Sequence, residues 1–196
     1  MVPFLGAAAL AFGAIFIAEF GDKSQLLILA FATRYPARPV VIGVVLAATI
    51  IQGISVAVGA AAGNFLPEGL VEIVSGLAFL AVAAWTLRGE DEEAAETDVA
   101  SGRRLAGIAL VLTVATTFMA SELGDKTMLA TFALAAQQGA LPTWIGSTAG
   151  EVAANLVAVV VGRQAGHRLS QRAIRIGSAA LFALAGVAVL IGAFLG

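Results

Sequence analysis

The chain has 196 residues, of which 60% are hydrophobic and 12% are charged, and its formal net charge is −2. Soluble domains carry about 25% charged residues, so this composition and a mean hydropathy of +0.96 exclude an ordinary soluble protein. The sequence contains no cysteine, which excludes disulfides, thiolate metal sites and a cysteine nucleophile. We therefore expect the lipid bilayer to be the main environment of the chain.

Six apolar stretches are long enough to cross a bilayer, because a spanning helix needs about 20 mostly apolar residues. They cover residues 3–33, 40–63, 69–87, 105–136, 143–166 and 173–195. The first stretch lacks the basic segment of a secretory signal and runs into a charged motif, so we expect it to remain as a helix. The pattern predicts an all-α membrane protein with six transmembrane helices.

An internal repeat relates the two halves of the chain at a constant offset of 103 residues. Rare polar residues keep this register, since Glu19 falls on Glu122 and Gln52 falls on the similar Asn155. The same offset also gives the pairs Gly21/Gly124, Asp22/Asp125, Lys23/Lys126, Pro39/Pro142, Gly43/Gly146, Gly59/Gly162, Gly63/Gly166, Ser75/Ser178 and Phe79/Phe182. We predict a first three-helix repeat at 1–87, an acidic linker at 88–104 and a second three-helix repeat at 105–196.

Three spans per repeat is an odd number, so the two repeats are expected to be inverted relative to each other in the membrane. The arginines lie in or beside the connections after the first, third and fifth spans: Arg34, Arg38, Arg88, Arg103, Arg104, Arg163, Arg168, Arg172 and Arg175. The positive-inside rule makes these connections, including the 88–104 linker, cytoplasmic and both termini exoplasmic. His167 belongs to the last of these basic connections, where we expect it to be solvated.

Each half carries one charged motif, Glu19-Phe-Gly-Asp22-Lys23-Ser24 or Glu122-Leu-Gly-Asp125-Lys126-Thr127. The two acids of a motif are three residues apart, so on a helix they point toward one place. Both motifs begin roughly 24 Å into their spans at 1.5 Å per residue, which is near or past the middle of a hydrocarbon core about 30 Å thick. Inverted repeats can therefore bring the four carboxylates together at mid-depth.

The balance of charge in the motifs favours binding of a divalent cation. A charged side chain at the bilayer centre costs on the order of 3 kcal/mol, so such residues usually line a pathway or pair with one another. Lys23 and Lys126 offset two of the four acids, and a divalent cation would balance the other two. The alternative is that the lysines only neutralise neighbouring carboxylates as part of helix packing. The spans supply oxygen ligands without Cys or His, which suits Ca²⁺, Mn²⁺ or Mg²⁺.

Further polar residues lie near the two motifs. Ser24, Thr127, Gln25, Gln52 and Asn155 are candidates to support the metal site, or to serve only as hydrogen bonds between helices. Glu151 has Ala48 as its repeat counterpart, so it is a candidate proton site or extra ligand unless it lies near the membrane interface. Gly21 and Gly124 are compatible with a break that frees backbone carbonyls, or with a continuous tilted helix.

The two complete motifs resemble those of the Gdt family, also called uncharacterised protein family 0016, and the resemblance extends over nearly the whole chain. It implies a secondary transporter that exports Mn²⁺, or else Ca²⁺, in exchange for protons, which compete with the metal for the same oxygens. It also implies Glu19, Asp22, Glu122 and Asp125 as ligands of the transported ion, with no permanently bound cofactor and no nucleic-acid partner. The short termini are typical of a bacterial inner-membrane protein.

Other functions fit the motifs less well. Intramembrane aspartyl proteases use a Gly-x-Gly-Asp pattern, but the position of the first glycine is Glu19 or Glu122 here, so we expect no enzyme activity. An exporter of basic amino acids remains an alternative, because carboxylates also bind ammonium and guanidinium groups. A membrane scaffold without transport activity is a third possibility, in which the motif acids would be dispensable.

Overall fold

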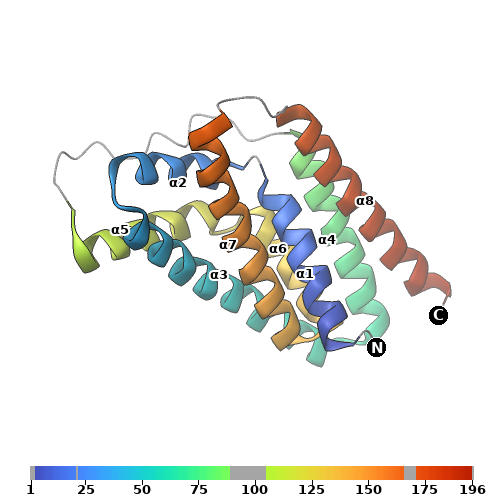
Figure 1. Ribbon diagram of the computed structural model, residues 1–196. Helices are drawn as coiled ribbons and strands as arrows, with labels where there is room; N and C mark the ends of the chain where they lie inside the picture. The colour runs from blue at the N-terminus through green and yellow to red at the C-terminus, as the bar shows by residue number, and fades with distance from the viewer. Residues whose placement is uncertain (1–2, 21, 89–104, 166–170, 196) are drawn as a thin grey trace.

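A computed structural model describes residues 3–20, 22–88, 105–165 and 171–195, and these residues form helices without any strand (Figure 1). In chain order the helices are α1 (Phe4–Glu19), α2 (Lys23–Arg34), α3 (Ala37–Phe65), α4 (Glu68–Arg88), α5 (Gly107–Glu122), α6 (Lys126–Gln138), α7 (Ala140–Ala165) and α8 (Gln171–Leu195). The predictions for the acidic linker and for His167 lie outside the described residues. The all-helical fold class is confirmed.

The first span expected in each half consists of two helices, α1 with α2 and α5 with α6. The helices α5 and α6 are bent by 77° relative to each other, and Gly124 between them has a φ of +79°, which glycine adopts at little cost. Leu123 has φ −62° and ψ 117°, and its repeat counterpart Phe20 is nearly identical at −66° and 123°. The two breaks therefore begin alike, although Gly21 itself lies outside the described residues.

Two of the described helices, Ala37–Phe65 and Gly69–Arg88, are each long and apolar enough to cross a membrane. The bent pair α5–α6 would be a third span if it counts as one, while Phe4–Glu19 and Ala179–Phe194 are apolar but shorter. The breaks at the motifs divide the first and fourth expected spans, so that α1, α2, α5 and α6 are each too short to cross a membrane alone. The six-span topology stays a prediction.

Glycines allow equivalent helices of the two halves to pack closely. A Cβ added to Gly43 in α3 would lie 2.8 Å from the Val114 Cβ in α5 and 2.9 Å from the Val111 carbonyl oxygen. A Cβ added to Gly146 in α7 would collide with Ala8 and Ala11 in α1, which are the repeat counterparts of those two residues. The α1–α7 and α3–α5 contacts are thus copies of one another.

Helices α4 and α8 lie side by side at one edge of the molecule (Figure 1). The rings of Phe79 and Phe182, which are repeat counterparts, stack with their centroids 6.2 Å apart. Large apolar side chains on the outer faces of the helices are exposed, for example Leu184 and Phe194. A bilayer would cover these apolar outer surfaces, whereas the acids of both motifs are buried inside the molecule.

Candidate metal-transport site

The two charged motifs, although 103 residues apart, meet inside the molecule. Glu19 and Glu122 are fully buried, and Asp22 and Asp125 are only 4% and 2% exposed. Glu19, Glu122 and Asp125 each offer a carboxylate oxygen, and the three oxygens lie within 4.8 Å of one another. That spacing suits a single ion with oxygen ligands at 2.1–2.6 Å on opposite sides.

The helix breaks position these carboxylates. Glu19 and Glu122 are the last residues of α1 and α5, and Asp22 and Asp125 directly precede α2 and α6. The same turn closes each break, because the Asp22 N–H donates to the Glu19 carbonyl at 3.2 Å and the Asp125 N–H donates to the Glu122 carbonyl at 3.1 Å. The N-termini of α2 and α6 direct their positive dipole ends toward the acids, which favours their negative charge.

One hydroxyl orients each glutamate of the site. Ser24 Oγ donates to Glu19 Oε2 at 3.1 Å, and Thr127 Oγ1 donates to Glu122 Oε2 at 3.3 Å. Among the described residues, the other oxygen of each carboxylate, Oε1, has no hydrogen-bond partner. A buried oxygen without a donor is costly, and a bound cation would satisfy both of these oxygens at once.

The lysine of the second motif pairs with the aspartate of the first. Lys126 Nζ lies 2.9 Å from Asp22 Oδ2, and both side chains are buried. The lysine therefore does not only neutralise its own motif, because this ion pair joins the two halves of the chain. The side chain of Lys23 lies outside the described part of the structure.

Glu151 in α7 adds a fifth buried acid beside the motifs. It is fully buried, and Gln52 in α3 donates a hydrogen bond to its Oε2. Glu151 is close enough to Glu19 and Glu122 for electrostatic repulsion. Its Oε1 and the amide oxygens of Gln52 and Asn155 have no hydrogen-bond partner among the described residues.

Two of the candidate supporting amides make bonds that need no metal. Gln25 Nε2 donates to the Ala154 carbonyl at 3.3 Å, which joins α2 to α7. Asn155 Nδ2 donates to the Glu151 carbonyl at 3.0 Å within α7. Gln25 thus makes an interhelical bond, whereas the oxygens of Gln52 and Asn155 remain able to face a cation or water.

The fold and the acidic site have the features of an integral membrane transporter for cations. A family model described as divalent cation/proton antiporter GDT1 matches residues 7–94 and 110–196, and the chain belongs to this family of transporters, which are not enzymes. The two matched segments correspond to the two halves of the internal repeat.

Curated relatives agree with this family. A Vibrio cholerae protein named "putative manganese exporter" is 29% identical over 183 residues, which cover 92% of this chain and 88% of that protein. A GDT1-like protein of Synechocystis sp. is 32% identical and is matched over 89% of its length. The chloroplast protein PAM71 of Arabidopsis thaliana is 33% identical, but only 54% of its length is matched. No solved structure matches the chain significantly.

Proposed function

We propose that this protein exports Mn²⁺, or alternatively Ca²⁺, across a bacterial inner membrane in exchange for protons. The observation that carries the proposal is the meeting of both motifs at one buried site, where oxygens of Glu19, Glu122 and Asp125 lie within 4.8 Å of one another. Carboxylate oxygens are hard ligands, which suits Mn²⁺ and Ca²⁺. The name of the Vibrio cholerae relative supports manganese as the first choice.

Four acids are proposed as the ligands of the transported ion: Glu19, Asp22, Glu122 and Asp125. Lys126 holds Asp22, and Ser24 and Thr127 orient the glutamates. The two motifs and Glu151 together contain five acids and two lysines in the sequence, so three negative charges remain when all groups are ionised. One divalent cation with one proton, or protons alone, would neutralise them, and this equivalence is the physical basis for exchange.

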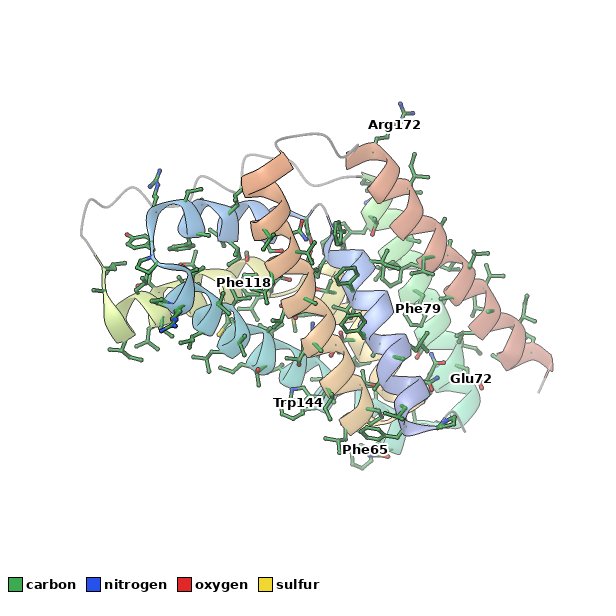
Figure 2. All side chains as sticks on the ribbon, in the orientation of Figure 1. Phe65, Glu72, Phe79, Phe118, Trp144 and Arg172 are labelled. Atoms are coloured by element: carbon green, nitrogen blue, oxygen red, sulfur yellow. The ribbon has the colours of Figure 1, made fainter. Side chains whose placement is uncertain are left out.

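The proposed architecture is a pair of inverted three-helix repeats, 1–87 and 105–196, with a cytoplasmic linker between them. Helices α4 and α8 support the inversion because they are antiparallel: Gly76 packs against Leu190, and Leu80 packs against Gly186. Figure 2 shows Arg172 at the opposite end of the bundle from Phe65, which agrees with a cytoplasmic end rich in arginine.

Transport by purified protein in lipid vesicles tests the proposal. We expect external Mn²⁺ or Ca²⁺ to drive proton movement in the opposite direction, and lysine to drive none. Glu19→Gln and Glu122→Gln should each lower the rate of metal-driven proton movement by more than the roughly 10–100-fold that loss of an outer-shell partner of a metal site costs. Glu72→Gln is the matched control, since Glu72 lies on α4 away from the site (Figure 2). Lysine flux without metal flux would instead indicate an amino-acid exporter.

A further inference from the structure

A line of buried polar side chains runs along one face of α7, and the equivalent positions of α3 are mostly apolar. The residues are spaced four apart, and each is fully buried: Thr143, Ser147, Glu151 and Asn155. Their repeat counterparts in α3 are Val40, Val44, Ala48 and Gln52. Equivalent faces of two equivalent helices are therefore polar in the second half and mostly apolar in the first.

Helix α6 extends this difference. Its fully buried Thr131 corresponds to Ile28 in α2. Ile28, Val40 and Val44 lie in one apolar cluster between α2, α3 and α5. Because Gly43 and Gly146 make equivalent contacts, the repeat places Thr131, Thr143 and Ser147 at the corresponding positions between α6, α7 and α1.

Thr131 and Thr143 differ in their hydrogen bonding from three threonines that are less buried, whereas Ser147 Oγ donates to the Trp144 carbonyl at 3.4 Å. Thr49, Thr113 and Thr116, which are not fully buried, each donate to the carbonyl oxygen four residues earlier in their own helix. In contrast, Thr131 Oγ1 and Thr143 Oγ1 have no hydrogen-bond partner among the described residues. A fully buried hydroxyl without a partner is unfavourable, and bridging water would satisfy both groups.

The polar line has one end at the site and the other at an end of the bundle. Glu151 is the site end, where Glu19, Glu122 and Asp125 are the neighbouring acids and Lys126 is the neighbouring cation. The other end is the start of α7 near Trp144, opposite Arg172 (Figure 2). In the orientation proposed above, this end is exoplasmic.

We propose that Thr131, Thr143 and Ser147 form a hydroxyl-lined path that carries protons between the exoplasmic side and the carboxylate site beside Glu151. This inference rests on the proposed exchange. A hydroxyl both donates and accepts a hydrogen bond, so with bridging water it can pass a proton along. Ile28, Val40 and Val44 close the equivalent route on the other side.

Two transport measurements in vesicles separate the path from the metal site. The variant Thr131→Val/Thr143→Val/Ser147→Ala removes the hydroxyls and nearly keeps the side-chain volumes. We expect proton release driven by Mn²⁺ to slow roughly tenfold, equivalent to about 1.4 kcal/mol. Exchange of labelled for unlabelled Mn²⁺ at equal pH needs no proton path, so its rate should stay within about twofold.

Controls and single variants guard against simple misfolding. Ile28→Val/Val44→Ala changes equivalent positions without removing a hydroxyl, and it should leave the ratio of the two rates as in the wild type. Thr143→Ser keeps the hydroxyl and should retain the proton-coupled rate that Thr143→Val loses.

The proposed path would be wrong if the triple variant and Thr143→Val kept the wild-type ratio of proton release to Mn²⁺ exchange. It would also be wrong if both rates fell equally. If the wild type shows no proton release with Mn²⁺, the exchange itself is wrong.

Discussion

The α2–α3 and α6–α7 regions occupy equivalent positions in the two halves, yet the buried face that leads away from the site is mostly apolar in the first and polar in the second. Val40 and Val44 lie where the second half has Thr143 and Ser147. The charged motifs and the glycine contacts are alike in both halves. Features that build the shared site are thus duplicated, whereas the surroundings that connect it to each end of the bundle differ. In an exchanger of metal and protons, such a difference can give the proton a path that the metal ion does not use.

The largest effect should follow from breaking the ion pair that joins the halves. Lys126→Gln removes the ammonium group that pairs with buried Asp22, and loss of one partner of a buried pair costs about 3–5 kcal/mol in the free energy of unfolding. Chemical denaturation in detergent would measure it.

Arg88→Gln, at the exposed end of α4, should change the stability by less than about 0.5 kcal/mol. Adding Asp22→Asn to Lys126→Gln should recover part of the loss, because it removes the carboxylate charge with which Lys126 pairs. If Lys126→Gln unfolds like the wild type, the pair does not hold the halves together.

An intermediate effect is expected from filling the glycine contacts. Gly43→Ala and Gly146→Ala each add a methyl group where backbone and side-chain atoms already lie, so each should destabilise the protein by about 1–3 kcal/mol. The equivalent contacts predict similar losses in thermal unfolding. Gly13→Ala is the control, since a Cβ there meets nothing within 4 Å and alanine favours a helix. A loss confined to one of the two sites would show that the halves do not pack alike.

The smallest effect should come from the two hydroxyls that orient the glutamates. Ser24→Ala and Thr127→Val each remove one hydrogen bond, worth about 1 kcal/mol, so the Mn²⁺ Kd should rise roughly fivefold in each. Isothermal titration would compare the two variants with Thr33→Ala, whose exposed hydroxyl bonds only within α2. If the Mn²⁺ Kd rises in only one of these two variants, the two motifs do not contribute equally to binding.

Much of this organisation could be predicted from the sequence because charge in a bilayer is costly. Buried acids in an apolar chain are expected to pair or bind an ion, and the repeat at 103 residues predicted that Glu19 and Glu122 would share one place. The sequence did not decide between a break and a continuous helix at Gly124, since glycine is compatible with both a helix and a positive φ.

Other features depend on how the helices pack. The pairing of Lys126 with Asp22 across the repeats is set by the tertiary arrangement. Thr143 and Ser147 do not stand out singly, since isolated hydroxyls are common in spanning helices. Their four-residue spacing with Glu151 and Asn155 is the feature of the sequence that could have predicted a polar face on this helix.

The two motifs meet at one buried site, and the stoichiometry of Mn²⁺ binding tests whether they bind a single ion together. Titration of the purified protein should give one Mn²⁺ per chain, with binding lost in Glu19→Gln and equally in Glu122→Gln. Two ions per chain, with one retained in each variant, would mean that each motif binds independently and would contradict the shared site.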